Sequence, residues 1–236
     1  SQFNIKEILL RMCRNSIYAV QNELCEGFLT LKYGHRVGVC GKINRQDNKI
    51  ISVTDFSSLN IRISREIIGA SDVVLPYIVI DNKPLNTLII SPPGCGKTTI
   101  LRDLARQLAG GKYMFRTGIV DERNEISSVY RGKPFNDVGH LSDILSFCPK
   151  PEGIIMLLRG MNPEVIITDE IGTEYDENAI LSTVNCGVKI ICSAHGYDVE
   201  DVKRRKGIGR LIDSRIFERI IVLSNKNGIG TVEKII

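Results

Sequence analysis

Residues 88–100, LIISPPGCGKTTI, join a run of β-forming residues to a helix-forming segment through a glycine-rich turn. Within them, residues 91–98, SPPGCGKT, match the phosphate-binding pattern G-x-x-x-x-G-K-[ST] except at its first glycine, where Ser91 stands. A strand that ends in such a turn and continues as a helix directs backbone N–H groups toward an anion. This stretch therefore predicts a P-loop within an α/β fold.

The chemistry of the turn assigns a role to each residue type. Pro92 and Pro93 lack an N–H group, so the amide donors must come from Gly94 onward, at the positive end of the helix dipole. Lys97 supplies a charge to the β- and γ-phosphates, and the hydroxyl of Thr98 is a ligand for Mg²⁺. We predict that ATP contacts the whole loop: Ser91, Pro92, Pro93, Gly94, Cys95, Gly96, Lys97, Thr98 and Thr99. The competing interpretation is an ordinary strand–turn–helix that contains a lysine by chance.

Residues 164–170, EVIITDE, are an apolar β-forming run that ends in Asp169 and Glu170. The carboxyl ends of parallel strands open into one crevice, so these acids are expected beside the P-loop, in the arrangement called Walker B. There Asp169 can hold magnesium and Glu170 can polarise the attacking water. Buried strands often end in an acid, so the run is informative because it follows a P-loop.

A second acid cluster ends the strand in residues 118–126, GIVDERNEI, with Asp121, Glu122 and Arg123. Charged residues commonly end strands, so solvated surface ion pairs are one interpretation. The other interpretation makes Glu122 the residue that activates water, in competition with Glu170. The residues alone leave the choice between the two glutamates open.

Two further side chains are candidates for phosphate chemistry. His195 follows the strand VKIICSA (residues 188–194), where a polar side chain can sense the γ-phosphate, although a lone histidine is more often structural. Arg159 lies where a helix stops before the Walker B strand. It could reach a phosphate of its own chain or of a neighbouring subunit, and an ion pair at an interface is the alternative.

The composition is that of an ordinary globular protein: 236 residues, 43% hydrophobic and 25% charged, with a net charge of +4. This excess is too small to indicate nucleic acid or anionic lipid as a partner. Seven cysteines without a C-x-x-C pair predict neither a zinc site nor a disulfide framework and fit a reducing cytosol. No apolar run approaches the ~20 residues that cross a bilayer, so any membrane contact is expected to be peripheral. Because the chain begins at Ser1 rather than methionine, we expect residues to precede it.

Residues 201–210, DVKRRKGIGR, gather five basic side chains without an aromatic one. They offer no stacking platform for single-stranded nucleic acid, so nucleic acid is not expected as a partner. A solvated helix face is the main interpretation. Supply of an arginine to an adjacent protomer, or contact with lipid headgroups, is the second.

The pattern of elements divides the chain near residue 85. Residues 1–85 are predicted to form a small α+β domain, with a helical segment, a hairpin, a half-buried strand in residues 59–67 that then turns helical, and a linker at 80–86. From residue 86 to residue 236, strands alternate with helices, which predicts a doubly wound, mostly parallel sheet. The expected strands are apolar runs: 87–91, 118–121, 164–169, 188–193 and 219–224, the last continuing into a terminal hairpin. One helix, in residues 173–187, is marked by acids in its first turns and by Gly187 at its end.

Several motifs, taken in order, resemble the stage III sporulation protein AA family over nearly the whole chain. They are GHRVGVCGKI (34–43), PPGCGKTTILRDLAR (92–106), GIVDERNEI (118–126), CPKPEGIIMLLRGMNPEVIITDEIG (148–172) and SAHG (193–196). More distantly, the chain is similar to the ATPases of type II and type IV secretion. Their acidic box, Walker B run and histidine box correspond to residues 121–123, 159–170 and His195.

The resemblance implies a RecA-like P-loop ATPase domain preceded by a smaller α+β domain, assembled as a homo-oligomeric ring, expected to be a hexamer, with ATP and Mg²⁺ between protomers. It also implies a place in the mother-cell cytoplasm of a sporulating bacterium, docked on membrane-embedded sporulation channel proteins. The chain departs from these relatives at Ser91 and at the pair Asp169–Glu170, where secretion ATPases often carry Gly–Glu. The second departure favours direct coordination of magnesium by Asp169.

The leading hypothesis from the sequence is therefore hydrolysis of ATP to ADP and phosphate, coupled to mechanical work on a membrane channel. A nucleic-acid-stimulated motor is an alternative, which the modest charge and the missing aromatic platform oppose. A nucleotide-binding assembly protein without turnover is the third hypothesis. Two acid clusters and a sensor histidine would be superfluous in such a protein.

Overall fold

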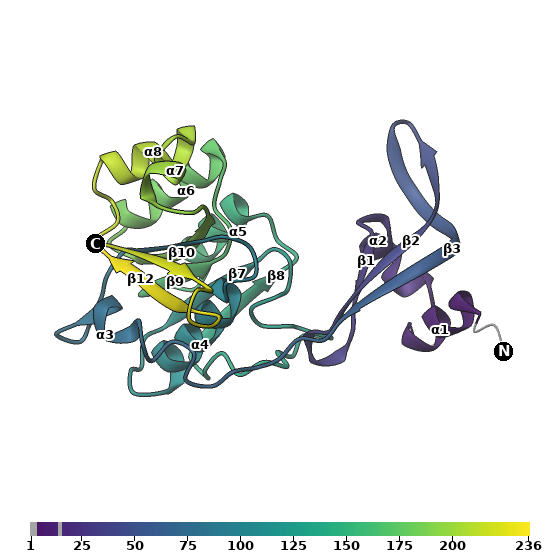
Figure 1. Ribbon diagram of the computed structural model, residues 1–236, viewed down its shortest axis with the longest axis horizontal. Coiled ribbons are helices and arrows are strands. Elements are labelled where there is room, and N and C mark those ends of the chain that lie inside the picture. Colours follow the sequence, from purple (N-terminus) through teal and green to yellow (C-terminus); the bar gives the residue numbers. More distant parts are fainter. Residues whose placement is uncertain (1–3, 14–15) are drawn as a thin grey trace. The chain divides into compact units, whose positions relative to one another are not determined.

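The computed structural model describes residues 4–13 and 16–236, which form two compact units, Ser1–Arg65 and Glu66–Ile236 (Figure 1). The predicted boundary at residue 85 thus lies inside the second unit. Residues 66–85 belong to that unit because their apolar side chains enter its core, where Val74 and Ile78 are fully buried.

The first unit is a three-stranded antiparallel sheet, in the order β1-β2-β3, with short helices packed on it. Its elements are α1 (Ile5–Met12), η1 (Tyr18–Val20), α2 (Gln21–Cys25), β1 (Phe28–Thr30), η2 (Lys32–Gly34), β2 (Arg36–Gln46) and β3 (Lys49–Arg62). The predicted hairpin is present: Asp47 and Asn48, with φ of 48° and 62°, form the two-residue turn between β2 and β3. The predicted helical segment includes α1 and α2, and its residues 14–15 lie outside the described residues.

The segment after β3 does not turn helical, contrary to the prediction. Residues 68–74 form turns, because Gly69 adopts a left-handed conformation (φ 83°) and Asp103 takes up the amides of Gly69 and Ser71. A short helix, α3 (Leu75–Ile78), follows these turns. The predicted linker at 80–86 lies in a tight hairpin of β4 (Val79–Ile80) and β5 (Lys83–Pro84), which closes through Asp81 and Asn82 at positive φ. Asx residues in a two-residue turn are typical of hairpins, so the same residues that predicted a linker build a hairpin instead.

The second unit is built on a seven-stranded sheet in the order β12-β11-β6-β10-β9-β7-β8. All neighbouring strands are parallel except β11 and β12, which form the predicted terminal hairpin. The strands are β6 (Thr87–Ser91), β7 (Thr117–Asp121), β8 (Ser142–Ser146), β9 (Val165–Thr168), β10 (Lys189–His195), β11 (Arg219–Ser224) and β12 (Thr231–Ile235). The edge strand β8 was not predicted, because SDILS lacks the apolar run that marks the buried strands.

Helices cover both faces of this sheet, as expected for a doubly wound fold. In Figure 1, α4 lies on one face and α6, α7 and α8 lie on the other. The helices are α4 (Lys97–Gly110), α5 (Lys150–Gly160), α6 (Glu174–Asn185), α7 (Val199–Lys203) and α8 (Lys206–Asp213). Successive residues of β6 alternate between the two cores, Leu88 and Ile90 facing α5 to α8 and Ile89 facing α4. The sheet is thereby buried on both sides, and its carboxyl edge carries the P-loop.

The predicted helix at residues 173–187 is α6, and a capping box fixes its start. Thr173 Oγ1 accepts a hydrogen bond from the Asp176 amide (3.2 Å), and the Asp176 carboxylate accepts one from the Thr173 amide (2.8 Å). Gly187, at φ 76°, follows its end. This cap places the helix directly after the loop that carries Asp169 and Glu170.

We expect Thr173→Ala to destabilise the protein by about 1 kcal/mol, because the amide of Asp176 loses its acceptor. Urea unfolding followed by circular dichroism would measure the change. Thr173→Ser keeps the hydroxyl acceptor and should remain within a few tenths of a kcal/mol of the natural protein. Equal destabilisation by both substitutions would contradict the capping role.

Candidate nucleotide-binding and catalytic site

The glycine-rich turn after β6 has the backbone of an anion cradle. Gly94 and Gly96 adopt left-handed conformations, with φ of 74° and 87°, and Gly96 precedes the first turn of α4. A Cβ atom at position 96 would lie 2.9 Å from Ile229 Cγ2, whereas one at position 94 would meet nothing within 4 Å. The turn is therefore packed against the β11–β12 hairpin on one side and open above Gly94.

The Lys97 ammonium group is buried within this turn. Its Nζ donates to the carbonyl oxygens of Ser91 (2.8 Å) and Pro92 (3.1 Å) and lies 3.1 Å from the Ser91 hydroxyl and 3.0 Å from His195 Nδ1. All these partners are neutral oxygen or nitrogen acceptors. Burial lowers the pKa of Lys97, while the charge of Glu170 opposes that shift. A buried cation held only by neutral acceptors is suited to receive an anion.

The Ser91 residue that replaces the first P-loop glycine has a structural role. It is the fully buried last residue of β6, and its hydroxyl donates to the Pro92 carbonyl (2.8 Å) and accepts from Lys97. Strand pairing also sets Ser91 directly opposite His195 of β10. The departure from the pattern thus adds an anchor for the lysine, and the turn keeps both of its left-handed glycines.

Asp169, the first residue after β9, is 1% exposed, and among the described residues its Oδ2 has no hydrogen-bond partner. Burial, followed by the nearby charge of Asp121, raises the pKa of Asp169 to about 7, and the charge of Lys150 opposes the shift. An unsatisfied buried carboxylate oxygen at this place fits a cation. The described residues contain no cluster of three or more acidic, histidine or cysteine side chains that could hold a metal ion. Proteins commonly bind Mg²⁺ through one or two carboxylates together with substrate phosphates. With Asp169, the half-buried Thr98 in the first turn of α4 could hold it.

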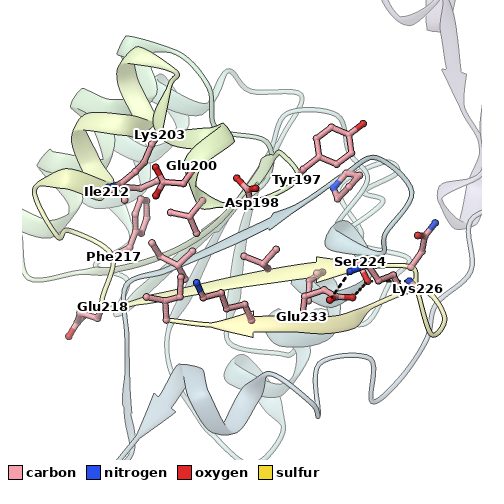
Figure 2. Close-up of a pocket in the computed structure, with 18 of the residues that line it drawn as sticks. Tyr197, Asp198, Glu200, Lys203, Ile212, Phe217, Glu218, Ser224, Lys226 and Glu233 are labelled. Carbon is pink, nitrogen blue, oxygen red and sulfur yellow. Dashed lines mark hydrogen bonds and ion pairs between the residues drawn. The ribbon is translucent and has the colours of Figure 1, made fainter.

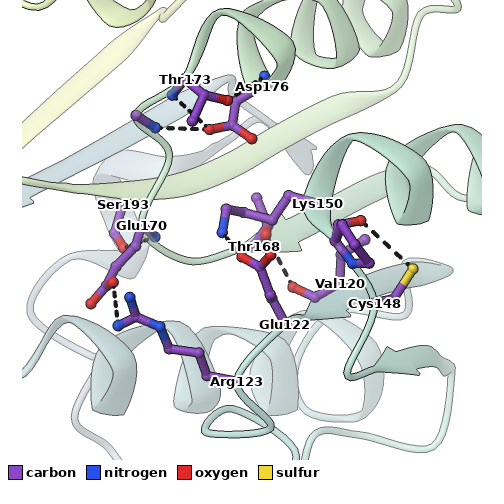
Figure 3. A network of polar contacts seen from close by, with 12 residues as sticks. Val120, Glu122, Arg123, Cys148, Lys150, Thr168, Glu170, Thr173, Asp176 and Ser193 are labelled. Atoms are coloured by element: carbon purple, nitrogen blue, oxygen red, sulfur yellow. Dashed lines mark hydrogen bonds and ion pairs between the residues drawn. The ribbon is translucent and has the colours of Figure 1, made fainter. Parts of the chain in front are cut away.

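Glu170 lies between two cationic or donor groups from other elements. Its Oε1 is 2.8 Å from His195 Nε2. Its Oε2 is 2.5 Å from Arg123 Nη1, the contact drawn in Figure 3. Its backbone has a left-handed φ of 43°, a conformation that costs energy for a residue with a side chain, and its amide donates to the Ser193 hydroxyl. The carboxylate is consequently held at a defined place beside the P-loop.

His195 links Glu170 to Lys97. An ammonium group can only donate hydrogen bonds, so His195 Nδ1 must accept from Lys97 and Nε2 must carry the proton that is donated to Glu170. A continuous chain of contacts therefore runs from Lys97 through His195 to Glu170. The structure brings these three predicted residues together from β6–α4, β10 and the loop after β9.

Glu122 has a different partner from Glu170. It forms an ion pair with the buried amine of Lys150, at the start of α5, and both residues line a cavity of about 370 Å³ together with Glu170 (Figure 3). Lys150 was not among the predicted site residues. The signal that could have found it is its place between Pro149 and Pro151 at the start of a predicted helix. A helix that begins there places the Lys150 side chain at the carboxyl edge of the sheet.

Asp121 serves the structure of its loop. Its carboxylate accepts hydrogen bonds from the amides of Glu125, Ile126 and Ser127 and from the Ser127 hydroxyl, at 2.6 to 3.1 Å. Arg102, buried on α4, donates to the carbonyls of Glu125 (2.6 Å) and Ile126 (3.0 Å) of the same loop. The loop that carries Glu122 and Arg123 is therefore fixed to β7 and to the helix of the P-loop.

Arg159 does not join this site within its own chain. It lies in the last turn of α5, nine residues beyond Lys150, and is exposed. Nine residues of helix span about 14 Å and carry it to the opposite edge of the sheet. A role for Arg159 toward a phosphate, of its own chain or of a neighbouring subunit, stays a prediction.

A larger groove, of about 1180 Å³, lies against β11, β12, α7 and α8 (Figure 2). Of the residues predicted to bind nucleotide, only Pro92 lines it. Within the predicted basic segment, Lys203 pairs with Asp213 (3.0 Å) and Arg210 pairs with Glu177 (2.6 Å). These ion pairs agree with a solvated helix face, and the converging charges of the P-loop site lie outside the groove.

The sheet order, the P-loop and the acids at the carboxyl edge define a RecA-like α/β fold of the kind found in secretion ATPases. The structure is similar to the ATPase DotB of Yersinia pseudotuberculosis, with a TM-score of 0.60 and 14% identity, over 97% of this chain and 65% of that chain. It is also similar to the pilus retraction motor PilT with bound ADP, with a TM-score of 0.55 and 13% identity, over 92% of this chain and 64% of that one. The chain thus spans just under two thirds of both, and at these identities the likeness shows the fold alone.

The chain belongs to the family described as sporulation stage III, protein AA, which matches residues 1–236. It is 44% identical to the stage III sporulation protein AA of Bacillus subtilis strain 168 over 231 residues, 97% of this chain and 75% of that protein. A second relative is the Arabidopsis thaliana protein SEEDLING PLASTID DEVELOPMENT 1, 30% identical over 156 residues, 65% of this chain and 22% of that protein. The resemblance inferred from the motifs is confirmed.

Among the described residues, no helix combines the length and the apolar character that a membrane crossing requires.

We expect Asp169→Asn to change how stability depends on pH when Mg²⁺ is absent. An aspartate with a pKa near 7 when folded and near 3.8 when unfolded holds a proton in the folded state that the unfolded state releases. The free energy of unfolding of the natural protein should therefore fall, relative to the variant, by up to about 4 kcal/mol as the pH rises from 4 to 7. Urea unfolding between pH 5 and 8 measures most of this window.

Asp143→Asn, on the edge strand β8, is the control substitution for this experiment. Parallel pH profiles of the Asp169 variant and the natural protein would show that the buried carboxylate is not the titrating group.

Proposed function

We propose that this protein binds ATP with Mg²⁺ and hydrolyses it to ADP and phosphate. The observation that carries the proposal is the chain of contacts Lys97–His195–Glu170 beside the unpartnered oxygen of Asp169. A buried cation with neutral partners is complementary to a phosphate. A buried acid without a donor is complementary to a metal ion. Both lie at the carboxyl edge of one parallel sheet, where such folds bind ligands.

In the proposed reaction, the amides from Gly94 through Thr99 and the Lys97 ammonium group hold the phosphates and stabilise the charge that develops during transfer. Magnesium, held by Asp169 and Thr98, would neutralise part of that charge. Glu170 orients the attacking water, because His195 contacts both Glu170 and the Lys97 that holds the phosphates, which places the Glu170 carboxylate near the phosphates. Glu122 is the second candidate for this role, because its partner is Lys150 of α5, whereas Glu170 is joined to Lys97 through His195. His195 relays the arrival of the phosphate to Glu170.

We further propose that the protein works as a homo-oligomeric ring, a hexamer, at the cytoplasmic face of a membrane in the mother cell of a sporulating bacterium. Its family takes part in sporulation by name, and the fold is that of DotB, an ATPase, and of PilT, a pilus retraction motor. Membrane-embedded sporulation channel proteins are the proposed partners. In a ring, the exposed Arg159 could serve a neighbouring subunit.

We predict that Lys97→Ala abolishes ATP turnover, because the buried cation that meets the phosphates is removed. The measurement is phosphate release over a range of protein concentrations, with and without single-stranded DNA. The natural protein should show a rate per protomer that rises with concentration, as sites are completed between subunits, and no response to DNA. Lys112→Ala, an exposed lysine just beyond the other end of α4, should keep full activity. Turnover that survives in the Lys97 variant would refute the proposal.

We predict that Glu170→Gln lowers the turnover number more than 100-fold while ATP still binds, because an amide cannot orient water as a carboxylate does. The Glu122→Gln variant should lose less than tenfold, because its carboxylate serves Lys150. Single-turnover hydrolysis and retention of labelled ATP on a filter would separate chemistry from binding. The reverse order of the two losses would assign the water to Glu122.

A further inference from the structure

We propose that Arg123 is a latch: it holds Glu170 while the P-loop is without nucleotide, and it releases Glu170 when a nucleoside triphosphate draws Lys97 away. Arg123 is a positioning residue in this inference, because it acts through Glu170. The inference rests on the proposed function, since a nucleotide must enter the P-loop for the latch to open.

The latch is built on a rigid support. Arg123 stands in the turn after β7, two residues beyond Asp121, whose carboxylate accepts hydrogen bonds from the amides of residues 125–127. Asn124, also in this turn, exchanges two hydrogen bonds with the backbone of Val129, at 2.7 and 2.8 Å. Arg102 of α4 grips the same loop. The backbone beneath Arg123 is thus fixed, so the guanidinium is directed at the loop after β9 and only its side chain needs to move.

Both carboxylate oxygens of Glu170 are engaged, one by His195 and one by Arg123. The Glu170 side chain is 20% exposed and the Arg123 side chain 50% exposed. A pair that is shielded on one side is stronger than a fully exposed one, and its outer member can still swing into water. The contact is therefore strong enough to set the position of Glu170 and open enough to be broken.

A triphosphate would weaken the two contacts of Glu170 unequally. The Lys97 ammonium group now donates to His195 Nδ1, and a phosphate at the cradle would draw that donor away. His195 would then be free to turn toward the phosphate, and Glu170 would be left with Arg123 alone. A water molecule held beside the bound triphosphate would compete with Arg123 for the Glu170 carboxylate, and Glu170 can accept from that water only by leaving Arg123. In the state that holds both the triphosphate and this water, the ion pair must therefore break, and its loss is a cost of reaching that state.

The consequence is a gain of affinity when the latch is removed. A ligand binds more tightly when it no longer has to break a contact of the free state. For one partly shielded ion pair, we expect Arg123→Ala to tighten binding of a non-hydrolysable ATP analogue with Mg²⁺ about three- to tenfold. Arg123→Lys retains a cation that can reach Glu170 and should stay within twofold of the natural protein.

Arg116 provides a matched control. Arg116 precedes β7, whereas Arg123 follows β7. The Arg116 side chain is 53% exposed and pairs with Glu164 (3.8 Å) at the other end of the sheet. Arg116→Ala removes an arginine of similar exposure, paired with a more exposed glutamate (43% against 20%), at the other end of β7, so it should leave analogue affinity unchanged. In a Glu170→Ala background, Arg123→Ala should have no further effect, because the latch has already lost its partner.

Isothermal titration of these variants with the analogue decides the matter. Weaker or unchanged binding by Arg123→Ala would overturn the latch, as would an equal gain in the Arg116 control or the same gain in the Glu170→Ala background. These results leave the proposed function standing, because the natural protein binds the analogue in each of them. Absence of binding by the natural protein would instead refute the proposed function and the latch with it.

Discussion

The parallel pairing of β6 with β10, in the register that sets Ser91 opposite His195, is the constraint on which the site depends. It brings the end of the P-loop strand against the histidine of a strand more than 100 residues later. Lys97 can then contact residues of both strands, and the neighbouring pairing of β10 with β9 adds Glu170 through Ser193 and His195. A shift of one residue in either pairing would turn every second side chain to the other face and separate these groups.

The two charged residues at the centre of this site are poorly compensated by the protein itself. Lys97 is buried among neutral acceptors, and burial holds the pKa of Asp169 near 7. Burying a charge without a partner costs stability, so such groups are rare in a core that serves only folding. Here Lys97 lacks an anionic partner and Asp169 lacks a cationic one. A phosphate with a bound divalent cation would supply both. Binding of these ligands would therefore raise the free energy of unfolding of the protein.

Other charged residues at the same edge serve the scaffold. Asp121 organises its loop, Arg102 ties that loop to α4, and Lys150 holds Glu122. These contacts use residue types that are equally common in active sites. Burial and the number of hydrogen bonds separate them: Asp121 is satisfied on both oxygens, whereas Asp169 keeps one oxygen without a partner among the described residues. The satisfied carboxylate of Asp121 stabilises its loop, and the unpartnered oxygen of Asp169 marks a place for a ligand.

The sequence by itself determined the glycine-rich turn with the P-loop pattern, the mostly parallel sheet and the family, because phosphate binding needs a local backbone pattern and buried parallel strands need continuous apolar runs. It could not place the edge strand β8, whose residues are polar. It also put the unit boundary some 20 residues late, because the Asx residues of a linker and those of a tight hairpin are the same. Only the tertiary structure decided that Glu170 contacts His195 and Arg123, that Glu122 contacts Lys150, and that Arg159 lies at the far edge. The partner of a charged side chain depends on strand order and register, which bring together residues far apart in the chain, and no local pattern encodes them.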